Sequence, residues 1–214
     1  MQAVIIGAGG FGREVFDWLR SSVAAKTDER VDLLGFVDDG VPDLALLERI
    51  GARYLGSVDW LAAHPNVVFY VAIGDPSVRE ELAARAEGTG AKAGPALIHA
   101  AAVVGSDVDL GAGSIICPNV TMTTNLRFGM HCHVNINATV GHDCTFGSYV
   151  TINPGATVSG SVTLEDGVTV GTGAAIIQGV TVGRLTTIGA GAAVVRDLPP
   201  AATAVGVPAR PLNR

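Results

Sequence analysis

Residues 134–170 read VNINATVGHDCTFGSYVTINPGATVSGSVTLEDGVTV, and every sixth position in this stretch is Val, Ile, Leu or Phe. The same register runs from Ile98 to Val194, where all seventeen such positions hold a large aliphatic residue, Met or Phe. The position that follows is Gly in eight of the seventeen hexads, and no charge occupies a first or fifth position. A period of six is typical of a parallel β-helix of hexapeptide repeats and fits no α-helix.

Three hexads close one triangular coil, so residues 18 apart should stack on each other. Asn135 and Asn153 are one coil apart, and Pro118 and Pro154 are two coils apart. We therefore predict an all-β domain over residues 98–199, with successive coils about 4.8 Å apart. Residues 200–214 would form a C-terminal tail. Cys132 and Cys144 hold fifth positions, which predicts that they fill the interior of the coils.

The first 97 residues follow a different pattern. Residues 3–15, AVIIGAGGFGREV, predict a strand, a turn with the G-x-G-x-x-G pattern and the start of a helix. LLGFVDD (33–39) and VVFYVAIGD (67–75) predict two more strands, and a helix should follow over 76–88. Strands that alternate with helices predict an α/β unit of Rossmann-like type with a parallel sheet.

A glycine turn before a helix places backbone N–H groups against an anion such as a phosphate. An acidic residue at the end of the second strand often contacts a ribose hydroxyl, and two acids stand there. A nicotinamide dehydrogenase is disfavoured, because the unit is too short for a dinucleotide fold with two halves. The candidate substrate-binding residues of this unit are Gly9, Gly10, Phe11, Asp38, Asp39, Ile73, Gly74 and Arg79.

Charge and composition exclude several classes of protein. The net charge is −6, and residues 98–214 contain five arginines, no lysine and six acids, so a nucleic-acid partner is not expected. No apolar run approaches the roughly 20 residues of a membrane span, and the N-terminal residues resemble a strand rather than a signal peptide. For that reason no membrane partner is expected. Three cysteines without metal-type spacing favour a reduced, cytoplasmic protein without a metal.

The repeat and the tail AVVRDLPPAATAVGVPARP (193–211) resemble the left-handed β-helix of hexapeptide acyltransferases. With the N-terminal unit added, the whole chain resembles the NeuD/PglD-type sugar acetyltransferases. That resemblance implies an acetyl-CoA-dependent enzyme in a homotrimer, with the active site between subunits. It implies N-acetylation of the amine of a nucleotide-linked 4-amino-4,6-dideoxy sugar. O-acetylation of sialic acid or of another small hydroxyl acceptor is the alternative.

The segment GHDCTFG (141–147) carries the expected chemistry. Acetyl transfer from a thioester requires a base that removes a proton from the acceptor, and histidine suits this task near neutral pH. His142 and Asp143 occupy the third and fourth positions of their hexad, which predicts a corner of the prism rather than its interior. The resemblance to the His–acid motif of the family implies His142 as general base and Asp143 as its partner.

The resemblance also implies where coenzyme A binds, in a groove between two β-helices. The backbone N–H of Gly160 would face the acetyl carbonyl, and Thr151 stands where some relatives have a second histidine. His131 and His133 are expected at a corner or near the acceptor, and His64 and His99 are expected to be structural. The candidate cofactor-binding residues are Thr151, Gly160, Thr172, Ala190, Arg184, Val207 and Pro208, with Arg196 and Arg210 as further candidates for phosphate contacts.

Two other functional classes, a zinc enzyme and a non-catalytic sensor, would also use the β-helix or the nucleotide-binding unit. A zinc enzyme of the γ-carbonic anhydrase type needs three histidines, two of them spaced H-x4-H, and residues 131, 133 and 142 lack that spacing. A non-catalytic nucleotide-sugar sensor would not need a histidine at a corner. Metal assay and acetyl-transfer assay discriminate these two classes from the acetyltransferase.

Overall fold

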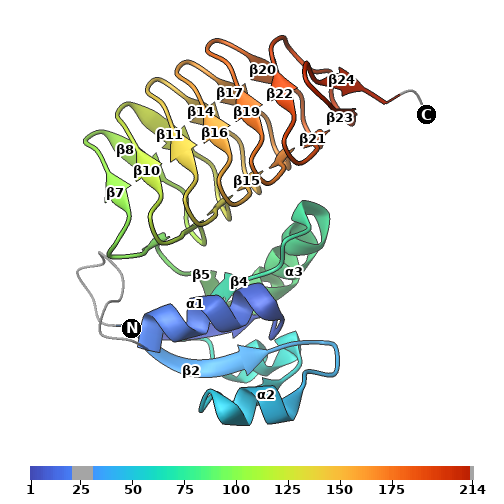
Figure 1. Ribbon diagram of the computed structural model, residues 1–214. Helices are drawn as coiled ribbons and strands as arrows, with labels where there is room; N and C mark the ends of the chain where they lie inside the picture. Colours follow the sequence, from blue (N-terminus) through green and yellow to red (C-terminus); the bar gives the residue numbers. More distant parts are fainter. Residues whose placement is uncertain (21–30, 213–214) are drawn as a thin grey trace. The chain divides into compact units, whose positions relative to one another are not determined.

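The computed structural model describes residues 1–20 and 31–212, and these residues form two compact units that divide between Ala100 and Ala101 (Figure 1). The predicted fold class, a Rossmann-like α/β unit followed by a β-helix, is confirmed. None of the helices within the described residues is long and apolar enough to cross a membrane.

The first unit is a parallel five-stranded sheet in the order β3-β2-β1-β4-β5. Its elements are β1 (Gln2–Ile6), α1 (Gly10–Arg20), β2 (Asp32–Val37), α2 (Leu44–Arg49), β3 (Tyr54–Gly56), the 3-10 helix η1 (Val58–Ala63), β4 (Val68–Val71), α3 (Pro76–Gly88) and β5 (Lys92–Ala93). Because β1 lies between β2 and β4 and all three are parallel, the turns after these strands share one edge of the sheet.

Glycine is required in the turn between β1 and α1. Gly7 has a φ of +103°, which L side chains rarely adopt. A Cβ at Gly12 would overlap the carbonyl oxygen of Gly7, so α1 can approach β1 only because residue 12 has no side chain. The G-x-G-x-x-G pattern therefore has a packing reason in this chain besides any role in binding.

The second unit consists of triangular coils in which each strand pairs with the equivalent strand of the next coil, as Thr121 with Thr139 and Thr145 with Thr163. Parallel two- and three-residue strands form its three faces, and β24 closes the tail as an antiparallel partner of β23. One face contains β7 (Val103–Val104), β10 (Thr121–Met122), β13 (Thr139–Val140), β16 (Thr157–Val158), β19 (Ala175–Ile176) and β22 (Ala193–Val194). The next contains β8 (Val108–Leu110), β11 (Leu126–Phe128), β14 (Thr145–Phe146), β17 (Thr163–Leu164) and β20 (Thr181–Val182). The last contains β6 (Leu97–Ile98), β9 (Ile115–Ile116), β12 (His133–Val134), β15 (Thr151–Ile152), β18 (Thr169–Val170), β21 (Thr187–Ile188), β23 (Thr203–Val205) and β24 (Arg210–Pro211).

The interior of the coils is filled as the hexads predict. The first-position side chains from Ile116 to Val194 are all buried, and so are the fifth-position Cys132 and Cys144. At the corners the backbone turns through the left-handed region, which Gly, Asn and Asp tolerate best. We number the corners by these residues: the first corner holds Asp107, Asn125, Asp143, Ser161 and Gly179; the second holds Asn119, Asn137, Gly155, Gly173 and Gly191; the third holds Gly113, His131, Tyr149, Gly167 and Leu185.

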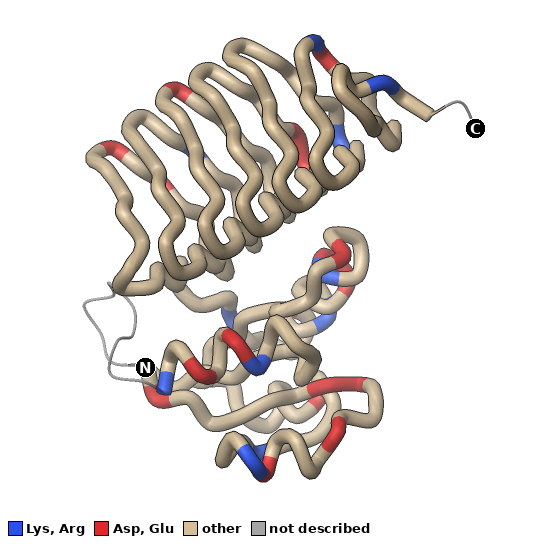
Figure 2. The backbone as a smooth tube through the Cα atoms, viewed as in Figure 1, with Lys and Arg blue, Asp and Glu red and all other residues tan. Residues whose placement is uncertain are grey.

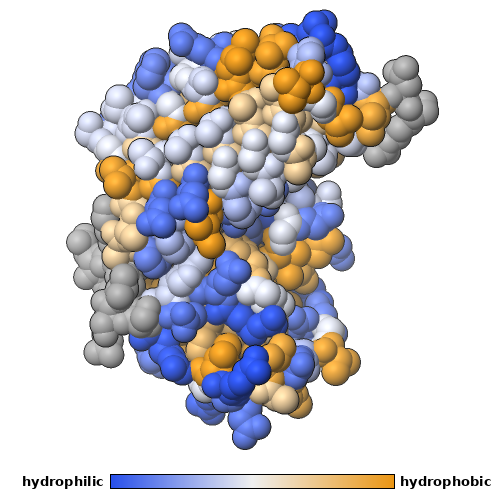
Figure 3. All heavy atoms as spheres, viewed as in Figure 1, coloured by the Kyte–Doolittle hydropathy of each residue, from blue (hydrophilic) through white to orange (hydrophobic). Residues whose placement is uncertain are grey.

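Charge and hydrophobic surface are unevenly distributed. The β-helix carries few charged residues compared with the first unit (Figure 2). Hydrophobic surface appears on the C-terminal coils (Figure 3), where the exposed large hydrophobic side chains are Ile177, Leu185, Val195, Val205, Val207 and Leu212. A surface of this kind, with few charges and several exposed aliphatic residues, is typical of a region that other molecules cover.

Candidate active site

His142 and Asp143 form a hydrogen-bonded pair at the first corner. The corner follows β13 and precedes β14, and Asp143 turns the chain with a φ of +59°. His142 Nδ1 lies 2.6 Å from Asp143 Oδ2, and the two side chains are 54% and 49% exposed. The pair is therefore formed in the single chain and is open to a substrate.

Asn125 lies one coil before Asp143 and holds the other carboxylate oxygen. Its Nδ2 donates to Asp143 Oδ1 at 2.6 Å. The hydrogen bonds from Asn125 and from His142 lower the pKa of Asp143 below its ordinary value of 3.8. An ionised carboxylate only accepts hydrogen bonds, so Nδ1 of His142 must carry the proton that lies between the two residues. In the neutral imidazole Nε2 then has the lone pair and is the basic atom.

Gly160 lies one coil after His142 and provides the surface against which the imidazole packs. A Cβ at residue 160 would stand 2.7 Å from Cε1 and 2.8 Å from Nε2 of His142. The backbone N–H of Ser161 donates to the His142 carbonyl oxygen at 2.7 Å. The structure thus brings the predicted residues His142, Asp143 and Gly160 together. The imidazole of His142 is oriented by Gly160 of the following coil and, through Asp143, by Asn125 of the preceding coil.

The predicted cofactor residues are distributed over other parts of the coils. Thr172 and Ala190 stack at the second corner, where Gly191 N donates to the Thr172 carbonyl at 2.9 Å. β23 pairs with β21 and leads into the turn with the cis bond between Val207 and Pro208, next to this corner. The second corner and the tail turn therefore form one continuous surface, separate from the first corner in the same chain.

Arg184 and Thr151 do not join that surface. Arg184 precedes Leu185 of the third corner, and its backbone N–H donates to Glu165 Oε2 at 2.8 Å. Thr151 lies in β15 on a flat face, in register with His133 of β12. His133 was expected either at a corner or near the acceptor, and the first of these is wrong, because it lies in strand β12. His131 is a corner residue, but it is buried and its ring stacks on Tyr149, with 5.4 Å between ring centroids.

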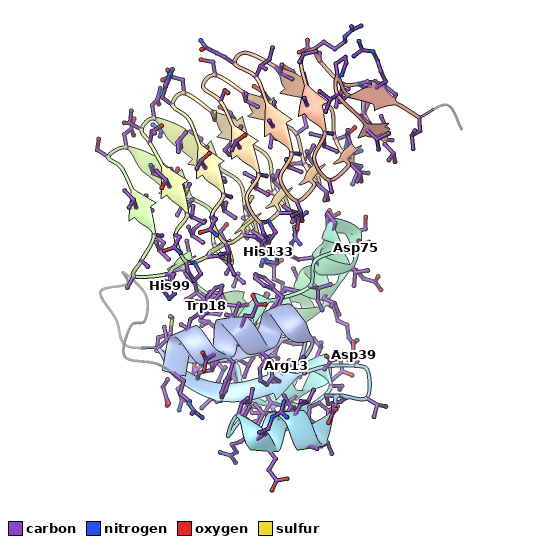
Figure 4. The ribbon with its side chains drawn as sticks, viewed as in Figure 1. Arg13, Trp18, Asp39, Asp75, His99 and His133 are labelled. Atoms are coloured by element: carbon purple, nitrogen blue, oxygen red, sulfur yellow. The ribbon has the colours of Figure 1, made fainter. Side chains whose placement is uncertain are left out.

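In the first unit, the two acids after β2 bind protein groups. Asp38 Oδ2 accepts from the Ala8 N–H at 2.7 Å, and its Oδ1 accepts from the Gly40 N–H at 2.8 Å. Asp39, labelled in Figure 4, accepts from the Val58 N–H at 3.1 Å and forms an ion pair with Arg85 at 2.5 Å. Both carboxylates thus hold the turns at the edge of the sheet where the strand ends meet.

The glycine turn itself is open. A Cβ at Gly9 or Gly10 would meet no atom within 4 Å, which leaves the N-terminus of α1 accessible to an anion. Phe11 follows and packs edge-on against Trp18, with ring centroids 6.4 Å apart.

The other predicted residues of this unit lie in the turn between β4 and α3. Arg79 Nη1 donates to the carbonyls of Ile73 and Gly74 at 2.7 and 3.2 Å. Asp75 caps α3 through the N–H groups of Ser77 and Val78, so the N-terminus of that helix is occupied (Figure 4). The structure therefore shows Arg79 bracing the turn that Ile73 and Gly74 form.

Among residues 1–20 and 31–212 there is no group of three or more His, Cys, Asp or Glu side chains that could hold a metal ion. The three cysteines are all buried and free. Burial is the main cause that raises the pKa of the Cys144 thiol. Cys132 and Cys144 fill the coils, as their fifth positions predict, and Cys117 is buried as well.

Comparisons with known proteins agree with this arrangement. Residues 2–86 match the PglD N-terminal domain family. A stretch of 140 residues is 36% identical to the GDP-perosamine N-acetyltransferase of Escherichia coli O157:H7; it covers 64% of this chain and 61% of the length of that enzyme.

Solved structures match over the full length. A histidine-to-asparagine mutant of perosamine N-acetyltransferase from Caulobacter crescentus, in complex with CoA and GDP-perosamine, is 31% identical with a TM-score of 0.87, over 100% of this chain and 98% of that one. The acetyltransferase domain of PglB from Neisseria gonorrhoeae, in complex with acetyl coenzyme A, is 31% identical with a TM-score of 0.84, over 99% and 98% of the two chains. The chain therefore belongs to the NeuD/PglD-type family of sugar acetyltransferases.

Proposed function

We propose that this protein transfers the acetyl group of acetyl-CoA to the amine of a nucleotide-linked 4-amino-4,6-dideoxy sugar. The observation that carries the proposal is the exposed His142 imidazole, which Asp143 orients with Nε2 as its basic nitrogen. Relatives that align over the whole chain have been crystallised with CoA and GDP-perosamine, or with acetyl coenzyme A, which supports the same pair of substrates.

The mechanism follows from the orientation of His142. As the sugar amine attacks the thioester carbonyl, Nε2 accepts the amine proton and a tetrahedral intermediate forms. Asp143 stabilises the resulting imidazolium through Nδ1–H, as the carboxylate does in Ser-His-Asp triads. Collapse of the intermediate breaks the carbon–sulfur bond, and the leaving thiolate of CoA takes the proton from the imidazolium. The products are the N-acetyl sugar and CoA.

We propose that the Gly160 backbone N–H donates to the oxygen that becomes negative in the intermediate. It lies beside the imidazole, where a carbonyl attacked by the acceptor amine would lie. Thr172, Ala190, Val207 and Pro208 would line the pantetheine and adenosine portion of CoA. Arg184 and Thr151 remain candidates for contacts with phosphate and thioester.

We further propose a homotrimer with the active site between subunits. The first corner carries His142, whereas the second corner and the tail turn carry the CoA candidates, and the face that contains β13 and β16 separates the corners. Two chains side by side can bring the first corner of one against the second corner of the other. Light scattering should give about three times the 21.8 kDa of one chain. A stable, active monomer would contradict the shared site.

The first unit is proposed to hold the nucleotide. The open N-terminus of α1 at Gly9 and Gly10 suits the diphosphate, and Phe11, Ile73 and Gly74 border the same edge of the sheet. Asp38, Asp39 and Arg79 would act by holding these turns in place. The free cysteines and the substrates together favour a cytoplasmic location.

The proposal is tested by thiol release from acetyl-CoA with UDP-, dTDP- and GDP-linked 4-amino-4,6-dideoxyhexoses, GDP-perosamine among them. Release of one equivalent of CoA per N-acetyl sugar, confirmed by mass spectrometry, is the expected result. If no amino sugar caused CoA release and a sugar hydroxyl was acetylated, the protein would be assigned to O-acetylation instead. Bound zinc with hydration of CO₂ would assign it to the carbonic anhydrase class.

Replacing Asp143 by Asn should lower kcat roughly tenfold or more. The asparagine side chain has one acceptor oxygen, so it cannot accept hydrogen bonds from both His142 and Asn125. In the wild type the hydrogen bonds from Asn125 and His142 lower the pKa of Asp143, so its carboxylate is ionised throughout the neutral range. The loss in kcat should therefore be similar at every pH near neutrality. A variant with the kcat of the wild type would show that Asp143 does not act on the base.

A further inference from the structure

We infer that Asn125 is a positioning residue of the active site, which acts on His142 through Asp143. The inference rests on the proposed acetyl transfer by His142. The observation is an uninterrupted chain of contacts along the first corner: Asn125 Nδ2 to Asp143 Oδ1 at 2.6 Å, and Asp143 Oδ2 to His142 Nδ1 at 2.6 Å. Nothing in the pattern around GHDC points to Asn125, which belongs to the preceding coil.

The backbone of the first corner explains why this residue can reach Asp143. Asn125 and Asp143 are one coil apart and have φ values of +55° and +59°, so they occupy equivalent places on adjacent coils. Equivalent residues of a β-helix stack directly, so their short polar side chains lie one above the other. Asparagine fits the lower place because it tolerates this backbone region and supplies N–H donors.

The equivalent residue of the preceding coil helps to explain why the Asn125 amide donates to Asp143. Asp107 lies one coil before Asn125, and its carboxylate is paired with Arg127 Nη2 at 2.8 Å. Arg127 Nη1 also donates to the Asp107 carbonyl at 3.0 Å. Asp107 is thus neutralised by Arg127, whereas Asp143 accepts a hydrogen bond from the Asn125 amide. Of these two acids at the first corner, Asp143 is the one that contacts the base.

Two consequences follow for His142. The Asn125 amide fixes one oxygen of Asp143, which leaves the other in a defined place for Nδ1–H. It keeps that carboxylate ionised, which fixes the imidazole tautomer with Nε2 as base. The other groups that face Asp143 do not compete for this role, since Ser161 above it holds the His142 backbone and the buried Cys144 thiol stays protonated.

The variants are chosen so that the corner still folds. Asn125→Gly removes the amide and keeps a residue that accepts a positive φ. Asn125→Asp keeps the shape but sets a carboxylate against Asp143, which disfavours the ionised pair. Asp107→Asn is the matched control, because it alters the same corner one coil away and breaks the pair with Arg127. Melting temperatures of all three should be compared with that of the wild type.

In the acetyl-transfer assay, Asn125→Gly should lower kcat roughly tenfold with little change in either KM, and Asn125→Asp should lower it further at neutral pH. Asp107→Asn should leave kcat within about twofold of the wild type. In an Asp143→Asn background the Asn125→Gly change should have no further effect, because a residue that acts only through Asp143 has nothing left to position. Full additivity of the two changes would overturn the inference.

A second measurement does not depend on turnover. The ¹⁵N spectrum of the His142 ring in the free protein should show the Nδ1–H tautomer in the wild type and in Asp107→Asn. Asn125→Gly should populate the other tautomer. If the wild type acetylates no amino sugar but the ring spectra change as described, the proposed function fails and the positioning role stands. If spectra and kcat are both unchanged in Asn125→Gly, the positioning role fails.

Discussion

Replacing His142 by Gln should lower kcat for acetyl transfer roughly 100- to 10,000-fold while the protein keeps its melting temperature. The glutamine amide can still donate to Asp143, but it has no basic nitrogen for the acceptor amine. Nearly half of the Asp143 side chain is exposed, and His142 slightly more, so the loss of the imidazole leaves no cavity in the core. The measurement is kcat and both KM values in the CoA-release assay.

The pattern of the kinetic changes identifies the role of the residue. A residue that serves only as base should leave the KM for acetyl-CoA nearly unchanged, since it contributes little to ground-state binding. The control is His64→Gln, because His64 stacks on Trp60 in the first unit and bonds the Trp60 carbonyl at 2.8 Å. Wild-type activity in His142→Gln would mean that the amine loses its proton without this histidine, and the proposed mechanism would be wrong.

The β-helix could be predicted from sequence because its rule is local and repeats. One inward side chain in six, with a small or apolar residue at the fifth position, is enough to specify short strands that stack coil upon coil. The Rossmann-like unit is predictable for a similar reason, as apolar strands end in glycine or aspartate turns. The structure adds that Gly12 is required by its contact with the Gly7 carbonyl, a cause that the pattern alone cannot separate from nucleotide binding.

The candidate site was only partly predictable. His142 and Asp143 are adjacent in the sequence, so their contact could be expected. Asn125 was missed, because its partner lies on the next coil and only the coil period relates them. The coil period was the available signal, because it relates Asn125 to Asp143 and Gly160 to His142. Residues one coil before or after a candidate base and its partner are the ones that contact them.

In the first unit, the sequence predicted the positions of the acidic residues but not their contacts. Asp38 and Asp39 match the acids expected to meet a ribose, yet their carboxylate oxygens bond Ala8, Gly40, Val58 and Arg85. A sequence shows that an acid ends a strand, but it does not show whether neighbouring backbone N–H groups occupy that acid. His131 is a similar case, since its place at a corner is visible in the sequence and its burial under Tyr149 is not.

Replacing Gly160 by Ala should lower kcat/KM roughly 100-fold through the position of His142 alone. The added Cβ would stand 2.7 Å from Cε1 and 2.8 Å from Nε2, closer than carbon and nitrogen atoms can approach, so the ring must move. Gly160 does not have a positive φ, which means that alanine fits its backbone and the fold should persist. Displacement by about an ångström is enough to remove Nε2 from the path of the amine proton and to loosen the contact with Asp143.

Gln178→Ala provides the control, because residue 178 lies one coil beyond Gly160 in the same column and is exposed. It should retain wild-type activity and a wild-type melting temperature. The ring spectrum of His142 should change in Gly160→Ala and stay the same in Gln178→Ala, which separates a displaced base from a general loss of order. If Gly160→Ala kept both its activity and the wild-type ring spectrum, the imidazole would not depend on the surface that Gly160 provides. The orientation of the base would then have to come from Asp143 and Asn125 alone.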